Sequence, residues 1–291
     1  MAEVRVGNKV VGDDHSCFIV AEIGINHNGD IDIARKLISI AMAAGCDAVK
    51  FQKRTVEVVY PPEELARPRE SPFGDTNGDL KYGLEFGLEQ YEQIDQFCRQ
   101  LKIHWFASCW DFQSVDFIDQ FDVPCYKIAS ACLTDDNLLR YTRAKGRPII
   151  LSTGMSTLEE IDHAIDVLGE EDLILLHTCS SYPAGYDELS LRVIPLLRQR
   201  YGVPVGYSGH ETGLPSTVAA VALGACVVER HITLGRAMWG TDQAASLEPN
   251  GLTRLVRDIR LIETSMGDGI KRITEKEMLV MKKLRRVGLS L

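Results

Sequence analysis

The sequence predicts a TIM (β/α)8 barrel preceded by a short N-terminal hairpin. Eight short, nearly continuous apolar runs alternate with amphipathic stretches, which is the pattern expected of a barrel of about 250 residues. Continuous apolar runs are typical of parallel strands that helices cover on both faces. Eight repeats favour a closed barrel over an open, doubly wound sheet, which needs fewer strands. The predicted strands are residues 18–23, 48–52, 104–108, 125–130, 148–152, 173–177, 204–208 and 226–231.

Amphipathic helices are predicted between these strands because apolar residues recur there at helical spacing. The stretch 31–45 ends at a glycine, which is a common helix stop. The stretch 156–168 begins with Ser156 and Glu159, the spacing of a capping box. The predicted helices are residues 31–45, 88–101, 156–168, 214–225 and 252–267.

Two segments lie outside the repeat. Residues 4–11, VRVGNKVV, predict a hairpin that turns at Gly7, Asn8 and Lys9, and we expect it to plug the bottom of the barrel. Residues 53–87 are polar, with several prolines and glycines, and are interpreted as a long loop. Because this segment follows the second strand, it should lie over the mouth of the barrel, and a loop of this length is more often functional than idle.

Composition narrows the class of protein. The formal net charge of −9 argues against nucleic-acid binding, which needs a clustered basic surface. Apolar runs are too short to span a membrane, and the N-terminus lacks the apolar core of a secretory signal, so a cytoplasmic location is predicted. The eight cysteines show no paired spacing, so they are expected to be reduced core residues rather than zinc ligands or disulfides. Residues 1–291 are interpreted as one domain.

Polar residues at the carboxyl ends of the predicted strands mark the expected active site, because the chemistry of TIM barrels lies there. His210 and His231 follow the last two strands, so neighbouring strands would present both imidazoles to the same opening. Two imidazoles with coordination positions left for water or substrate suit Mn²⁺, Fe²⁺, Co²⁺ or Zn²⁺. The alternative is two unrelated histidines, one capping and one in the core.

Lys50 and Lys127 lie inside apolar strands, where an unpaired ammonium is costly, so each implies a nearby anion. One interpretation is an internal ion pair with Glu22 or Asp242. The other is a pair of cations that grip one phosphate or carboxylate of a ligand. Strand-end hydroxyls would then add neutral donors around that ligand. These hydroxyls belong to Ser108, Ser130, Ser152 and Ser208.

Motifs along the chain resemble the sialic acid synthase family, which includes N-acetylneuraminate and N-acylneuraminate-9-phosphate synthases. Each motif is short, but their order and spacing across residues 16–265 are specific. The motifs are FIVAEIGINHNGD (18–30), AVKFQK (48–53), YKIAS (126–130), RPIILSTGMST (147–157), GYSGHETG (206–213), VALGACVVERHITL (221–234) and GTDQAASLEP (240–249).

The resemblance implies a transferase that condenses phosphoenolpyruvate with a mannosamine-type aldose, using a divalent ion such as Mn²⁺ or Mg²⁺, and releases phosphate from a 2-keto-3-deoxy product. It implies catalytic roles for Glu22, His210 and His231, with the two histidines as metal ligands. It also implies small-molecule partners and a homodimer. Phosphoenolpyruvate would contact Lys50, Ser108, Lys127, Ser130, Ser152, Ser180 and Ser208, and the sugar would contact Gln52, Tyr182 and Asp242.

The chain departs from the family pattern at several points. Cys132 stands where an acid is common after the fourth-strand serine, Gly235 replaces a usual aspartate, and Ser108-Cys109-Trp110 replaces a usual Thr-Pro-Phe. The antifreeze-like C-terminal domain of the family is expected to be absent. These departures leave the acceptor sugar open. A metal-dependent aldolase or isomerase on the same barrel, and a barrel without catalytic activity, are the alternative functions.

Overall fold

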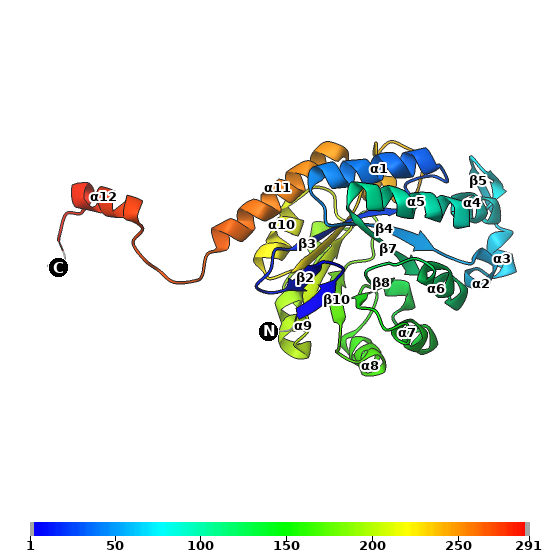
Figure 1. The fold of residues 1–291 in the computed structure, drawn as a ribbon, viewed down its shortest axis with the longest axis horizontal. Helices are drawn as coiled ribbons and strands as arrows, with labels where there is room; N and C mark the ends of the chain where they lie inside the picture. Colours follow the sequence, from blue (N-terminus) through cyan, green and yellow to red (C-terminus); the bar gives the residue numbers. More distant parts are fainter. Residues whose placement is uncertain (1–2, 289–291) are drawn as a thin grey trace.

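The computed structural model describes residues 3–288 and contains a closed barrel of eight parallel strands, in which each strand neighbours the next along the chain (Figure 1). The predicted fold class is therefore confirmed. The last strand closes the barrel by pairing with the first, so that His231 lies opposite Glu22. The barrel strands are β3 (Phe18–Gly24), β4 (Ala48–Lys53), β7 (His104–Cys109), β8 (Tyr126–Ile128), β9 (Ile149–Ser152), β10 (Leu173–Thr178), β11 (Val205–Gly209) and β12 (Val227–His231).

Helices cover the outside of the barrel between successive strands (Figure 1). The five predicted helices are present, and three further helices, α6, α7 and α9, were not predicted. These three span only two turns or slightly more, which is too short for a strong periodic signal. The helices are α1 (Ile31–Ala44), α5 (Leu88–Leu101), α6 (Phe112–Asp119), α7 (Asp136–Arg143), α8 (Leu158–Leu168), α9 (Val193–Tyr201), α10 (Pro215–Ala222) and α11 (Pro249–Met266).

The capping box of α8 was predicted one residue too early. Thr157 is the N-cap: its hydroxyl accepts from the backbone N–H of Glu160, and the Glu160 carboxylate accepts from the backbone N–H of Thr157. Ser156 instead donates to the carbonyl of Gly154 at 3.3 Å. The sequence Ser-Thr-Leu-Glu-Glu satisfies the capping pattern in two registers, so the pattern alone does not distinguish them.

The strand predicted over residues 125–130 is also shorter in the structure. It ends at Ile128, and Ser130 begins a 3₁₀ turn, η1 (Ser130–Cys132). Two other 3₁₀ turns, η2 (Tyr186–Glu188) and η3 (Gln243–Ala245), follow later strands on the same side of the barrel.

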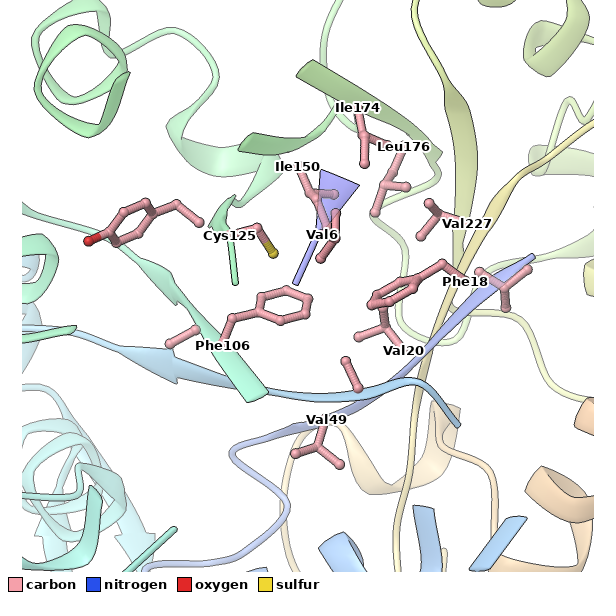
Figure 2. Close-up of a cluster of buried hydrophobic side chains, with 14 of the residues drawn as sticks. Val6, Phe18, Val20, Val49, Phe106, Cys125, Ile150, Ile174, Leu176 and Val227 are labelled. Carbon is pink, nitrogen blue, oxygen red and sulfur yellow. The ribbon is translucent and has the colours of Figure 1, made fainter. Parts of the chain in front are cut away.

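The N-terminal hairpin closes the bottom of the barrel, as expected. Strands β1 (Glu3–Val6) and β2 (Lys9–Gly12) pair antiparallel around Gly7 and Asn8. Figure 2 shows Val6 in the middle of the apolar side chains that fill this end, with Phe18, Phe106 and Ile150 around it. Gly7 is required at the turn, because its φ is +60° and an added Cβ would lie 2.5 Å from the His104 ring.

Residues 53–87 are not the loop that the sequence suggested. They form α2 (Val56–Val59), α3 (Pro62–Leu65), the hairpin of β5 (Pro68–Ser71) and β6 (Gly74–Thr76), and α4 (Asn77–Leu84). These elements are short and polar, so they lack the apolar periodicity that identifies a helix or strand. The segment lies at the end of the barrel toward which β4 points, which is the expected position (Figure 1).

The chain continues past α11 into α12 (Glu275–Leu284), which stands away from the barrel and has no buried side chain (Figure 1). None of the helices in the described residues combines the length and apolar character needed to cross a membrane. The eight cysteines are free, and all but Cys179 are buried.

Candidate active site

A cavity of about 200 Å³ lies at the carboxyl ends of the barrel strands. Every predicted site residue lines this cavity except Asp242. The Oδ2 atom of Asp242 lies 3.6 Å from Nδ1 of His231, beside the cavity. Glu229 also lines the cavity and was not predicted as a site residue. The residues of the predicted set that line it are Glu22, Lys50, Gln52, Ser108, Lys127, Ser130, Ser152, Ser180, Tyr182, Ser208, His210 and His231.

Lys50 lies between two buried carboxylates. Its Nζ is 3.2 Å from Oε2 of Glu22 and 3.3 Å from Oε1 of Glu229, and it donates to the hydroxyl of Ser108 at 3.0 Å. Glu22 and Lys50 are register partners on neighbouring strands, which brings their side chains together. Burial opposes charging of Lys50, but the two carboxylates outweigh it and raise the pKa of the ammonium.

Lys127, on β8, approaches the carboxylate of Glu229 from across the barrel, since β8 lies opposite β12. Its Nζ donates to Ser152 at 2.7 Å and lies 3.8 Å from Oε1 of Glu229, which also accepts from Ser208 at 3.0 Å. Burial lowers the pKa of Lys127 to about 8, although Glu229 opposes this shift. Burial would raise the pKa of Glu229, but Lys127 and Lys50 outweigh it and lower that pKa to about 2.

These contacts show that the internal ion-pair interpretation of the lysines holds in part. Lys50 pairs with Glu22 as anticipated, but the second acid is Glu229, and Asp242 faces His231 instead. The alternation of side chains along a strand could have identified Glu229. Residues two apart point to the same face, so an inward His231 requires an inward Glu229.

The lysines and acids balance at two charges of each sign, so a ligand anion would compete with Glu22 and Glu229 for the ammonium groups. Of the two acids, Glu22 holds a proton more readily, because its pKa is raised and that of Glu229 is lowered. Burial raises its pKa above the ordinary value, while Lys50 and His231 oppose the rise. Its Oε1 accepts from Gln52 at 2.9 Å, and its Oε2 lies 3.2 Å from Nζ of Lys50 and makes no hydrogen bond in the described chain. Glu22 is therefore placed to hold or release a proton inside the cavity.

The two imidazoles of His210 and His231 lie side by side, with ring centroids 5.3 Å apart. Tyr182 stacks over His210 at 4.0 Å and meets the edge of His231 at 5.7 Å. Burial and the neighbouring His231 lower the pKa of His210 to about 3, so this ring is neutral. The interpretation of two unrelated histidines is excluded by this proximity.

The donor atoms of this pair fit a divalent ion with open coordination positions. His210 donates its Nδ1–H to the carbonyl of Cys179 at 2.6 Å, which leaves Nε2 without a proton. Nδ1 of His231 is buried and makes no hydrogen bond within residues 3–288. No group of three or more His, Cys, Asp or Glu side chains is arranged as a metal cage in the described residues. The chain would thus supply two imidazoles and leave the other positions to substrate and water.

A buried network on the outer side of β12 fixes the turn that carries His210. Arg230 donates to Oε1 of Glu211 at 3.2 Å, to the Glu211 carbonyl at 2.5 Å and to Thr217 at 2.6 Å. Tyr207 donates to the other oxygen of Glu211 at 2.9 Å. Glu211 follows His210 directly, so this network holds the imidazole in place from behind.

Ser130 and Ser180 converge on the turn after β9. The backbone N–H of Gly154 donates to Ser130 at 3.0 Å, and an added Cβ on Gly154 would lie 2.3 Å from Oγ of Ser180. Only glycine leaves room for these two hydroxyls to meet at the wall of the cavity.

Comparison with known proteins agrees with this geometry. The model of the NeuB family matches residues 37–271. N-acetylneuraminate-9-phosphate synthase of Homo sapiens is 39% identical over 279 residues, which cover 94% of this chain and 78% of the human protein. The chain belongs to the NeuB family. This confirms the resemblance to sialic acid synthases that the motifs indicated.

Other relatives of this NeuB-family chain carry different names. N,N'-diacetyllegionaminic acid synthase of Legionella pneumophila is 35% identical over 290 residues, covering 96% of this chain and 82% of the relative. The solved structure of N-acetylneuraminic acid synthetase from Leptospira borgpetersenii, in complex with citrate, superposes with a TM-score of 0.86 at 29% identity and covers 98% of both chains. The family is therefore shared by synthases of several sugar acids.

Proposed function

We propose that this chain condenses phosphoenolpyruvate with an aldose of the N-acetylmannosamine type, in a reaction that needs a divalent metal ion. The products are a 2-keto-3-deoxy sugar acid and inorganic phosphate. The observation that carries the proposal is the single cavity in which two lysines and several serine hydroxyls adjoin a pair of imidazoles. Family membership supports the same reaction, because the relatives are synthases of sugar acids of this kind.

The lysine side of the cavity would bind phosphoenolpyruvate. Lys50 and Lys127 supply charge, while Ser108 and Ser152, already within 3.0 Å of these ammonium groups, supply hydroxyl donors. In this arrangement the lysines exchange part of their contact with Glu229 for the ligand's oxygens. The serines orient the ammonium groups so that they face the ligand before it arrives.

The imidazole side would bind the acceptor. His210 and His231 would hold the divalent ion, which when bound supplies Lewis acidity that polarises the aldehyde of the acceptor. Tyr182 covers both rings and limits how the sugar can lie against them. Gln52 and Asp242 flank this region and would contact the hydroxyl groups of the sugar.

The proposed reaction forms one carbon–carbon bond and cleaves the bond between C2 and the phosphate oxygen. C3 of phosphoenolpyruvate forms a new bond to the aldehyde carbon, and the aldehyde oxygen takes up a proton. Water adds at C2 and the bond between C2 and the phosphate oxygen breaks, which leaves a ketone and inorganic phosphate. Of the two protons of the water, one balances the proton taken up by the aldehyde oxygen and the other goes to the departing phosphate. Glu22 is placed to move a proton in these steps, since burial raises its pKa and its Oε2 has no partner other than Lys50 within the described residues.

The test is release of inorganic phosphate from phosphoenolpyruvate in the presence of N-acetylmannosamine or its 6-phosphate, with and without a chelator. We expect release to require both an aldose and Mn²⁺ or Mg²⁺. His231→Gln should reduce kcat by a factor of about 10³, because it removes one ligand of the ion that stabilises developing charge. His163→Gln is the matched control, because His163 lies on the outside of α8, where it pairs with Asp136.

Two results would contradict the proposal. One is phosphate release that persists in the chelator or in the His231 variant. The other is aldol cleavage that yields pyruvate without consuming phosphoenolpyruvate, which would indicate the aldolase alternative.

A further inference from the structure

Asn26 is a buried amide close to the imidazole pair that the proposed condensation does not use. It lies in the turn between β3 and α1 and is only 1% exposed. Its Nδ2 carries two N–H groups, and both are used. One donates to the carbonyl of Ile232 at 2.9 Å, and the other donates to the hydroxyl of Ser246 at 2.8 Å. Asn26 thus joins the end of the first barrel strand to residues that follow the last one.

Both contacts of Asn26 lead to the imidazole side of the active site. Ile232 directly follows His231, so the first contact fixes the backbone next to this ring. The Ser246 hydroxyl accepts from Asn26 and donates its own hydrogen to the carbonyl of Asp242 at 2.6 Å. Two hydrogen bonds in series therefore connect Asn26 with the backbone of Asp242, whose carboxylate lies 3.6 Å from Nδ1 of His231.

The segment that carries Asp242 is held between the turn after β3 and the end of β12. Gln243, which is also 1% exposed, donates from its Nε2 to the backbone carbonyl of Asn26 at 3.4 Å. The backbone N–H of Leu247 donates to the carbonyl of His231 at 2.8 Å. The Asn26 side chain contacts both the residue after His231 and the segment of Asp242, so it sets the position of one relative to the other.

The position of Asp242 decides whether His231 has an acceptor for a ring N–H. Nδ1 of His231 is buried and makes no hydrogen bond within residues 3–288, and the carboxylate 3.6 Å away is just beyond hydrogen-bonding distance. A histidine that binds a metal usually donates its other ring N–H to a carboxylate or carbonyl, which fixes the ring and its tautomer. His210 has such a partner in the Cys179 carbonyl, at 2.6 Å. Asp242 is the group placed to serve His231 in the same way.

We propose that Asn26 is a positioning residue for the metal site. Through Ser246 it holds Asp242 where this carboxylate orients the imidazole of His231. The inference rests on the proposed function, in which the two imidazoles bind a divalent ion. Asn26 does not line the cavity, so it acts through Asp242 rather than on a substrate. The role requires an amide, because a carboxylate at this position has no N–H for the Ile232 carbonyl.

The test measures the dissociation constant of Mn²⁺ by titration calorimetry in the absence of both substrates. Asp242→Ala should weaken Mn²⁺ binding by about tenfold to a hundredfold, the range for a residue that orients a metal ligand. Asn26→Ala should weaken binding by about tenfold, the lower end of that range, because the carboxylate is still present but no longer held. Ser246→Ala should weaken it by less, because Asn26 keeps its contact with Ile232.

A double variant separates positioning from a general effect on the fold. In a protein that already carries Asp242→Ala, Asn26→Ala should cause no further loss of Mn²⁺ affinity, because the carboxylate that Asn26 positions is gone. Loss of packing around Asn26 would lower the affinity in both backgrounds.

Asn77→Ala is the matched control. Asn77 is also a buried asparagine, 3% exposed, but its side-chain hydrogen bonds stay within the inserted segment, where they join it to Glu64 and Arg69. This variant should lower the midpoint of thermal unfolding, as Asn26→Ala should, and leave the dissociation constant of Mn²⁺ unchanged.

The inference is overturned if Asn26→Ala and Ser246→Ala bind Mn²⁺ as tightly as the wild type, or if Asn77→Ala loses as much affinity as Asn26→Ala. It is also overturned if Asn26→Ala weakens binding equally with and without Asp242. Each of these results leaves the condensation itself standing. Failure of the wild-type protein to bind either Mn²⁺ or Mg²⁺ would instead contradict the proposed function.

Discussion

The two ends of the barrel interior differ sharply although the same strands build both. The lower end is apolar and closed by the hairpin, with Val20, Phe106 and Val227 among its side chains (Figure 2). Two residues further along their strands, the inward positions hold Glu22, Ser108 and Glu229. Because successive residues of a strand alternate between faces, these three polar residues stand one layer above the three apolar ones.

The two ends of the barrel interior contribute differently to stability and to function. The lower layer removes apolar surface from water and fills the interior at close packing, which stabilises the fold. The upper layer buries Lys50, Lys127, Glu22 and Glu229, whose desolvation offsets much of their mutual attraction. We therefore expect changes in the lower layer to affect unfolding, and changes in the upper layer to affect binding more than their volume would suggest.

The largest expected effect on stability lies in the lower layer. Phe106→Ala should reduce the free energy of unfolding by about 3–5 kcal/mol, because it leaves a cavity among fully buried neighbours. Denaturant titration measures this loss. Phe112→Ala, at an exposed position on α6 where the ring stacks on Tyr141, should cost about 1 kcal/mol. Equal losses in the two variants would show that the lower layer is not the stabilising part.

In the upper layer, Glu229→Gln should destabilise the ligand-free protein by about 2–3 kcal/mol, since it removes the charge that faces both lysines while keeping a hydrogen-bonding group. Phosphoenolpyruvate should restore stability more in this variant than in the wild type, because its anion replaces the missing carboxylate. Thermal unfolding with and without the ligand measures both effects. Glu63→Gln, on the surface of α3, is the control, and an equal ligand response in all three proteins would refute the expectation.

The pH dependence of phosphoenolpyruvate binding should show whether Lys127, in the upper layer, holds this ligand. The pKa of Lys127 is about 8, so the ammonium is present below that pH and is lost as pH rises through it. We expect KM for phosphoenolpyruvate to rise by up to about tenfold for each pH unit above 8. Lys127→Arg should remain charged and show a flat profile there. A wild-type KM that stays constant from pH 7 to pH 9.5 would contradict this assignment.

The smallest expected effect comes from a residue on the active-site side that serves only the fold. Thr157→Ala should lower the free energy of unfolding by about 1 kcal/mol through loss of the α8 cap. Ser156→Ala, one residue earlier, should change it by less than about 0.5 kcal/mol. If thermal melts show the reverse order, Ser156 rather than Thr157 caps the helix, as the sequence predicted.

Much of the barrel could be predicted because strands buried on both faces leave a strong local signal. The apolar runs around Val20, Ile150 and Val227 placed their strands within one or two residues. The inserted segment could not be predicted in the same way. Its helices and hairpin are short and polar, and they are held by long-range contacts such as that of Phe73 with Trp239.

The site, like the fold, could be predicted only in part. Residues at strand ends, such as Lys50, Lys127 and His210, could be grouped because neighbouring strands of a barrel bring their ends together. Glu229 was missed although its alternation with His231 pointed inward. The contacts of Asn26 could not have been predicted, because they join it to Ile232 and Ser246, which lie 206 and 220 residues further along the chain.

The sequence by itself determined the closed barrel, the family and the group of residues at the strand ends, because these follow from local periodicity and from spacing along the chain. Only the tertiary structure decided which charges meet. It paired Lys50 and Lys127 with Glu229 and turned Asp242 toward His231. The physical reason is that charge pairing depends on distances of a few ångströms between segments, which no pattern of neighbouring residues encodes.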